Sequence, residues 1–141
     1  MGFSLSAVAA ILGVTLLISL EITIGSVIPA VTDVDESFKN MKDRAIDQIQ
    51  TDIEIKNVSV EAYGLNFNHT IYMNNTGSTT LKSTDCQILI NGIKQQFNSS
   101  ELYIYPNSQV QFTVNNLPGS GIKRYKVITK NDISDYFEYE I

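Results

Sequence analysis

The chain has 141 residues, with 15 acidic and 10 basic side chains and a net charge of -5. Nucleic-acid-binding proteins cluster Lys and Arg against phosphates, and the basic residues here are few and scattered, so we expect no nucleic acid partner. Cys86 is the only cysteine and His69 the only histidine. An intramolecular disulfide and a Cys/His metal cluster are therefore excluded, and we expect no metal and no cofactor.

The N-terminal segment is apolar enough to cross a membrane. Residues 2–20 carry no charge, and at about 1.5 Å per helical residue they approach the roughly 30 Å hydrocarbon thickness. A cleaved signal would have a basic start and a shorter apolar core, whereas this segment starts without Lys or Arg and stays apolar past Glu21. We expect a retained transmembrane helix over 1–32, with Glu21 at the headgroup level and a kink at Pro29.

Residues 33–50 continue at helical spacing and predict a helical stalk. The apolar positions leave three interpretations open, namely pairing with another copy, packing on the chain's own domain, or an ordinary amphipathic connector. The stripe is formed by Val34, Phe38, Met41, Ala45 and Ile49.

From Asp52 onward the pattern changes to the alternation of β-strands. A phase shift at Asn57 predicts a bulge at that residue of the first strand. The dipeptide Asn91-Gly92 predicts a hairpin with a type I′ turn between 87–90 and 93–97. Pro118 to Gly121 predicts another turn. Further strands are expected at 69–74, 79–81, 101–105, 109–114, 123–129 and 135–140.

Short strands at intervals of about 8 to 12 residues, without helical patterns between them, are typical of an antiparallel sandwich. The predicted fold class is all-β, an immunoglobulin-like sandwich over 51–141 preceded by one long N-terminal transmembrane and stalk helix. The chain has no Trp and one Cys, so an antibody-type domain is excluded. A small barrel is the alternative.

No catalytic motif is present, and we expect a protein that is not an enzyme, without catalytic, cofactor-binding or metal-binding residues. The chain has no Gly-x-Ser-x-Gly, phosphate loop or metal cluster. We expect His69 at the surface and Cys86 as a small buried side chain. The acidic residues near the C-terminus lack the spacing of a calcium loop.

Aromatic residues gather near two of the predicted strands, and exposed Tyr is common at interfaces. The C-terminal strand could serve as an edge that pairs with a neighbour. The aromatic residues are Tyr103, Tyr105, Tyr136, Phe137 and Tyr139.

The two signals for membrane orientation conflict. The basic residues Lys39, Lys42 and Arg44 lie in the stalk and none precedes the apolar segment, so the positive-inside rule places the β domain inside. Four N-glycosylation sequons in the β part have meaning only outside the cell, and together they favour the outward placement. Their acceptors are Asn57, Asn68, Asn74 and Asn98.

The opening Met1-Gly-Phe-Ser4, the apolar helix that follows, the short stalk, and a β domain beginning Ile53-Glu-Ile55-Lys-Asn57-Val58 resemble the archaeal FlaF family. The resemblance implies an accessory protein of the archaellum, the archaeal motility machinery. It implies a single-pass anchor in the cytoplasmic membrane and a sandwich in the pseudoperiplasm, at the archaellum basal body. The sandwich would form a homodimer, bind the S-layer protein and, with other archaellum components, act as a stator.

Two related families remain as alternatives. Type IV pilin-like and archaellin-like filament subunits also join an apolar helix to a β head, but they carry a basic residue before a Gly cleavage point. Here Gly2 follows Met1 directly, and Ala7 stands where bacterial members have Glu. The accessory protein FlaG also combines a helix with a β-sandwich.

Overall fold

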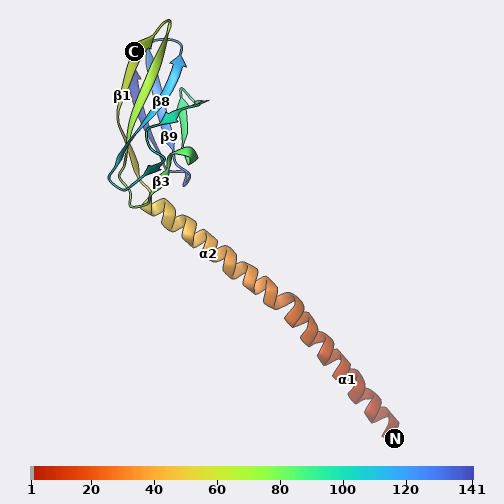
Figure 1. Ribbon diagram of the computed structural model, residues 1–141. Helices are drawn as coiled ribbons and strands as arrows, with labels where there is room; N and C mark the ends of the chain where they lie inside the picture. The colour runs from red at the N-terminus through yellow and green to blue at the C-terminus, as the bar shows by residue number, and fades with distance from the viewer. Residues whose placement is uncertain (1) are drawn as a thin grey trace. The chain divides into compact units, whose positions relative to one another are not determined.

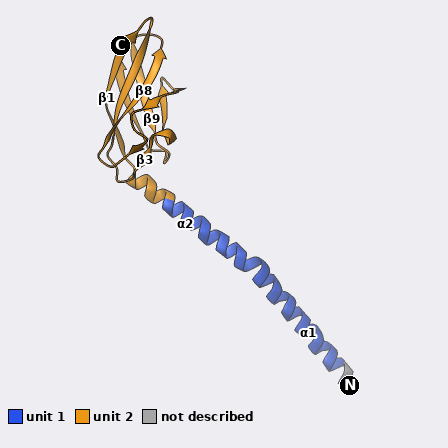
Figure 2. Cartoon of the chain, in the orientation of Figure 1, with its two compact units in different colours: residues 1–43 blue, residues 44–141 orange. Residues whose placement is uncertain are grey.

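The computed structural model describes residues 2–141, with side chains from Ser4 onward. Of the motif Met1-Gly-Phe-Ser4, Met1 therefore lies outside the described residues, as does the side chain of Phe3. The chain forms two compact units, residues 1–43 and residues 44–141 (Figure 2). The first unit is helical, and the second joins the last turns of a helix to a β domain (Figure 1).

The apolar segment forms α1 (Gly2–Ile22), followed by a π-helical turn, η1 (Thr23–Val27), and by α2 (Ile28–Gln50). The N–H of Ile28 donates to the carbonyl oxygen of Thr23, the i to i−5 bond of a π-turn. Pro29 lacks an N–H, and its ring would clash with the carbonyl four residues earlier in a regular α-helix. The irregularity expected at Pro29 therefore takes the form of a wider turn just before it.

Three hydroxyl groups within the apolar segment are satisfied by the helix itself. Thr15 donates to the carbonyl oxygen of Leu12 at 2.9 Å, Ser19 to that of Thr15 at 2.8 Å, and Thr23 to that of Ser19 at 2.9 Å. Such internal bonds suit a hydrocarbon environment, where water is unavailable as a partner. By length and composition this helix could cross a membrane.

The β domain contains two four-stranded antiparallel sheets and one two-stranded sheet. The first four-stranded sheet has the order β1-β2-β8-β6, the second β10-β9-β4-β5, and the small sheet pairs β3 with β7. The bounds are β1 Ile53–Tyr63, β2 Asn66–Asn75, β3 Leu81–Lys82, β4 Gln87–Ile90, β5 Ile93–Gln95, β6 Asn98–Ser99, β7 Tyr103–Ile104, β8 Gln109–Leu117, β9 Ile122–Ile128 and β10 Ser134–Glu140.

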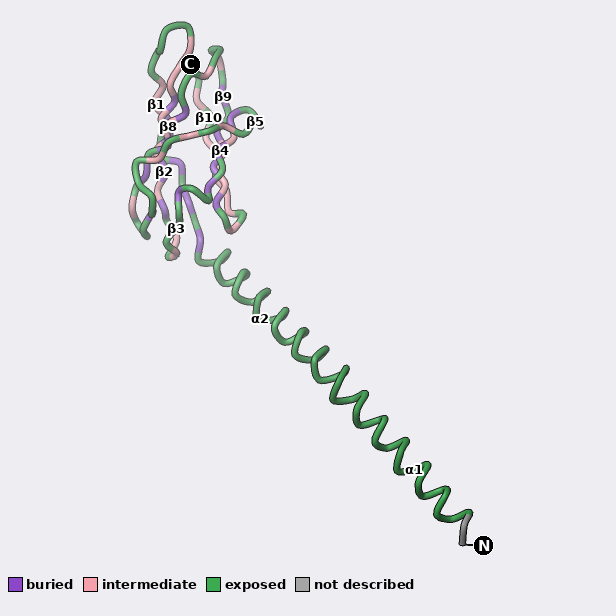
Figure 3. Tube along the Cα trace, turned by 45° about the vertical axis from the view of Figure 1, so that its right-hand side comes forward, coloured by how far each residue is buried: buried purple, intermediate pink, exposed green. Residues whose placement is uncertain are grey.

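Alternate residues of both large sheets belong to one shared core, and Figure 3 shows the buried positions of the β domain in purple. β2 contributes Ile71 and Met73, β8 contributes Phe112, and β9 contributes Tyr125 and Val127, all with essentially no exposed surface. Phe97 packs edge-on against Phe112 with ring centroids 5.0 Å apart. The predicted antiparallel sandwich preceded by one long helix is confirmed.

Two local predictions are also confirmed. The pairing of β1 with β2 shifts register between Ile55 and Asn57, so the bulge is present and its extra residue is Lys56, one position before the predicted Asn57. Asn91 and Gly92 both have positive φ, 52° and 81°, as a type I′ turn requires. The turn places Ile90 opposite Ile93. The strand β6 was not predicted, because it has only two residues and no alternation.

Asp135 joins the edges of the two large sheets. Its Oδ2 accepts a hydrogen bond of 2.7 Å from the backbone N–H of Ile55, beside the bulge in β1. Asp135 belongs to β10, the edge strand of the other sheet. A carboxylate that occupies an edge N–H prevents that N–H from pairing with another strand. Because β10 lies beside β1 and contacts it through Asp135, part of the edge that β10 was predicted to offer to a neighbour is already occupied.

Replacing Asp135 with Ala should lower the free energy of unfolding by about 1 to 3 kcal/mol, because the N–H of the buried Ile55 loses a charged acceptor. Urea denaturation of residues 44–141 measures the change. Glu140→Ala, in the same strand at an exposed position, is the control and should have less effect. Equal losses for both variants would show that the bridge contributes no stability.

Candidate functional site

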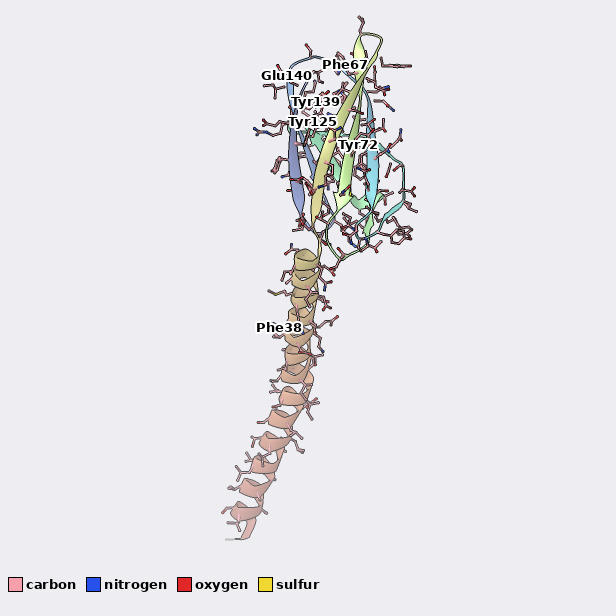
Figure 4. All side chains as sticks on the ribbon, turned by 90° about the vertical axis from the view of Figure 1, so that its left-hand side faces the viewer. Phe38, Phe67, Tyr72, Tyr125, Tyr139 and Glu140 are labelled. Carbon is pink, nitrogen blue, oxygen red and sulfur yellow. The ribbon has the colours of Figure 1, made fainter. Side chains whose placement is uncertain are left out.

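The histidine is buried in the sandwich core, so the prediction of a surface position is wrong. His69 lies on β2 with 0% of its surface exposed, and its Nδ1 is 2.7 Å from Oη of Tyr125 on β9. Figure 4 shows Tyr125 inside the sandwich. His69 takes an inward position of β2, in phase with Ile71 and Met73, which the alternation of the strand could have indicated.

The environment of His69 favours the neutral imidazole. Burial, and secondarily the charge of Lys123, lower the pKa of His69 to about 4. Its Nε2 has no hydrogen-bond partner among the described residues, so an added proton there would find no acceptor. Burial also raises the pKa of Tyr125 to about 12. The pair is therefore a neutral structural contact between the sheets rather than an acid–base site.

Cys86 behaves as predicted, as a small buried side chain. Its surface is 5% exposed, and its Sγ donates weakly to the carbonyl oxygen of Lys82 at 3.7 Å. Burial, with a smaller effect of the Asp85 charge, raises the pKa of this thiol to about 11. Since the thiolate is the reactive form, Cys86 has little nucleophilic character near neutral pH.

The end of α2 is held by a loop of the sandwich within the second unit. The N–H of Ser78 donates to the carbonyl oxygen of Gln50 at 2.8 Å, and the N–H groups of Thr76 and Gly77 donate to that of Asp52, each at 3.0 Å. A Cβ on Gly77 would lie 2.4 Å from the Asp52 nitrogen and 2.5 Å from the Gln50 oxygen. The helix can end on this loop only because residue 77 is glycine.

The buried side-chain amide of Asn75 holds the same loop in place through hydrogen bonds. Asn75 is fully buried, and its Nδ2 donates to the carbonyl oxygens of Thr79 at 2.8 Å and Ile104 at 3.0 Å. Its Oδ1 accepts from the N–H of Gly77 at 3.2 Å. Loop residues fixed by buried hydrogen bonds form a stiff connection between helix and sheet. We refer to residues 50–52 and 75–79 as the helix joint.

The aromatic residues singled out in the sequence do not form one cluster. Tyr103 and Tyr105 are exposed at and just after β7, in the region of the small sheet. On β10 Tyr136 is exposed, whereas Phe137 and Tyr139 pack against the core. The alternation of β10 therefore separates Tyr136 from its two neighbours.

Tyr136 belongs to a shallow groove on the outer side of the β10-β9-β4-β5 sheet, which we call the β9 face. Its residues pair across the strands, with Tyr136 opposite Lys126 and Glu138 opposite Arg124. The Lys126 Nζ lies 4.7 Å from the centre of the Tyr136 ring. The β9 face is lined by Leu89, Asn91, Gly92, Ile122, Arg124, Lys126, Tyr136 and Glu138.

The β9 face combines the side chains that protein interfaces favour. Ile122 and Tyr136 expose 68% and 54% of their surface. Arg124 reaches Oε1 of Glu138 from Nε at 2.9 Å and from a terminal nitrogen at 2.7 Å, which holds its guanidinium in place. Aromatic and Arg side chains are enriched at binding surfaces, and cross-strand contacts reduce the entropy lost when they bind.

The sequon asparagines differ in their surroundings. Asn57 and Asn98 are exposed. Asn68 is half-buried, and its Oδ1 accepts from the N–H of Asn116 at 3.0 Å. Asn74 is half-buried, with its Oδ1 buried and unpaired among the described residues.

Within residues 2–141 no group of three or more His, Cys, Asp or Glu side chains is arranged to hold a metal ion. No family model matches the chain. A search of curated proteins finds no match either.

Proposed function

We propose that this chain is a membrane-anchored structural component of the archaellum, similar to FlaF, whose sandwich binds the S-layer outside the cell. The observation that carries the proposal is the order of elements: a helix apolar enough to span a membrane leads to a β-sandwich with an exposed groove. The chemical groups of the domain favour binding over catalysis, because His69 is buried and neutral and Cys86 is a buried thiol.

In this proposal α1 lies in the cytoplasmic membrane and the sandwich lies in the pseudoperiplasm. A stator must transmit load, and the helix joint supports such a role. Three backbone N–H groups of the loop donate to carbonyl oxygens at or just after the end of α2, so a force on the helix reaches the sheet through hydrogen bonds. The β9 face is the proposed contact with the S-layer, because it presents Tyr136 and Arg124 on a rigid sheet.

Binding of residues 44–141 to isolated S-layer sheets tests the proposal, with an unrelated sandwich domain as control. We expect saturable binding, and we expect Tyr136→Ala to weaken it at least about tenfold, as for an aromatic residue at the centre of an interface. Tyr105→Ala is the matched control, since Tyr105 is similarly exposed but lies outside the β9 face. Absence of binding would contradict the S-layer role, and equal losses would contradict the choice of face.

A filament subunit is the second candidate, favoured by the exposure of the apolar residues along both helices. Subunits of pilin-like filaments lose N-terminal residues on processing and are found in shed filaments. The two functions separate by mass spectrometry of the mature N-terminus and by the protein content of sheared filaments. An intact N-terminus and absence from filaments favour the accessory anchor.

The outward placement predicts glycans at the exposed sequons. Asn57 and Asn98 should be occupied, whereas a glycan at Asn74 would require its half-buried side chain, whose Oδ1 is buried, to move outward. Glycopeptide mass spectrometry of the protein from its native membrane measures occupancy. Asn57→Gln and Asn98→Gln should each remove one glycan mass and leave folding unchanged. Occupancy at Asn74 with a folded domain would contradict this prediction.

A further inference from the structure

We propose that the stalk helices of two copies of this chain pair in parallel and in register through one apolar stripe. The stalk stripe consists of residues separated alternately by four and three positions along the helix. An average spacing of 3.5 residues is the repeat of a coiled-coil seam, where apolar side chains of one helix fit between those of the other. The stripe is Val27, Val31, Val34, Phe38, Met41 and Ala45.

The stalk stripe is uncovered in the described chain. Val34, Phe38 and Met41 expose 70%, 66% and 63% of their surface, and Figure 4 shows the Phe38 side chain projecting from the helix. Neighbouring stripe residues line two shallow apolar grooves, one around Val31 and the other around Phe38. Burying such side chains is favourable by about 1.5 to 3 kcal/mol each for residues of this size. A partner that covers the stripe would therefore be stabilised by several contacts.

The charged residues of the stalk avoid the seam. Residues 33–47 contain eight charged side chains, and none occupies a stripe position. In a parallel pair, a residue flanking the seam faces the partner residue five positions further along. Ala30 would face Asp35, and Ser37 would face Lys42, so no like charges meet. Asp35 is also bound to Lys39 of its own helix at 2.7 Å.

A second copy suits this stripe better than a lipid surface does. The stalk carries five acidic and three basic residues between 33 and 47, and anionic headgroups would repel the acidic excess. The seam is short, below the three or four heptads of an independent coiled coil. The inference therefore rests on the proposed membrane anchor, which makes the two helices parallel and raises their local concentration.

Cysteine crosslinking of the full chain in liposomes tests the pairing. In a Cys86→Ala background, Val34→Cys and Met41→Cys place single thiols on the seam, and Glu36→Cys and Asp43→Cys place them on the opposite side of the same turns. A disulfide needs Cα atoms within about 7 Å, so mild oxidation at a low protein-to-lipid ratio should give at least about fivefold more dimer at 34 and 41. Equal crosslinking at all four positions, or none, would overturn the proposal.

A substitution in the stripe tests whether the seam causes the crosslinking, and an extraction step tests the membrane anchor. Adding Phe38→Asp to Val34→Cys should reduce the dimer at least about fivefold, because it buries an unpaired charge, whereas Lys39→Asp outside the seam should not. Alkaline carbonate extraction of the same liposomes separates the two proposals. Retained chain without preferential crosslinking contradicts only the pairing, and released chain contradicts the anchor and the pairing with it.

Discussion

Replacing Gly77 with Ala should lower the free energy of unfolding of residues 44–141 by about 3 kcal/mol or more, because the new Cβ would overlap backbone atoms. The nearest atoms are the Asp52 nitrogen at 2.4 Å and the Gln50 oxygen at 2.5 Å, and neither belongs to a side chain that could rotate away. The loop would have to move and weaken the hydrogen bonds of the helix joint. Urea or thermal unfolding measures the loss.

Gly64→Ala is the control for this variant. Gly64 has a positive φ of 64° and open space around its Cα, so alanine there should cost about 1 kcal/mol from backbone strain alone. The φ angle of Gly77 is not positive, so glycine is needed there because a larger residue has no space, not because of backbone conformation. If Gly64→Ala were the more damaging of the two, the close approach at the helix joint would not be a determinant of stability.

The domain should lose stability in acid through His69. The pKa of His69 is about 4 in the folded state, below the ordinary value of 6.5, so the unfolded chain binds a proton more readily between these values. The free energy of unfolding that depends on a neutral His69 is complete above pH 6.5 and falls as the pH is lowered to about 4. The expected loss in free energy of unfolding is about 2.5 kcal/mol at pH 4.5 relative to pH 7.

Denaturation of two variants at pH 4.5 and pH 7 tests whether His69 causes the loss of stability in acid. The double variant with His69→Leu and Tyr125→Phe removes the titrating group together with its partner, so the part of the loss due to His69 should disappear. Tyr125→Phe alone keeps the imidazole and should retain the pH dependence, while costing about 1 to 3 kcal/mol at pH 7. An unchanged pH dependence in the double variant would show that other groups cause the acid sensitivity.

Much of the β domain was predictable because its signals are local. The inward residues Ile71 and Met73 and the turn at Asn91-Gly92 follow from alternation and from backbone conformation, which short segments encode. The bulge beside Asn57 was visible as a change of phase. The strand β6 has too few residues to show a period, and it forms because β8 offers it a pairing edge.

The candidate sites were less predictable, because each depends on residues far apart in the chain. His69 was expected at the surface because it lies within a sequon at the edge of a predicted strand, and the pairing of β2 within the sandwich placed it beside Tyr125 instead. The predicted aromatic cluster divides among the small sheet, the β9 face and the core. The alternation of β10 is local, but which side of that strand meets the core depends on the opposite sheet.

The sequence by itself determined the apolar helix, the polar β domain and most strand positions, because hydrophobic period and turn chemistry act over a few residues. It also determined the part of the stalk stripe from Val34 to Ala45, which needs only helical geometry. The tertiary structure alone decided the burial of His69, the edge contact of Asp135 with Ile55, and the need for glycine at residue 77. These features arise where strands and loops distant in sequence approach one another, and such distances are set by the packing of the whole domain.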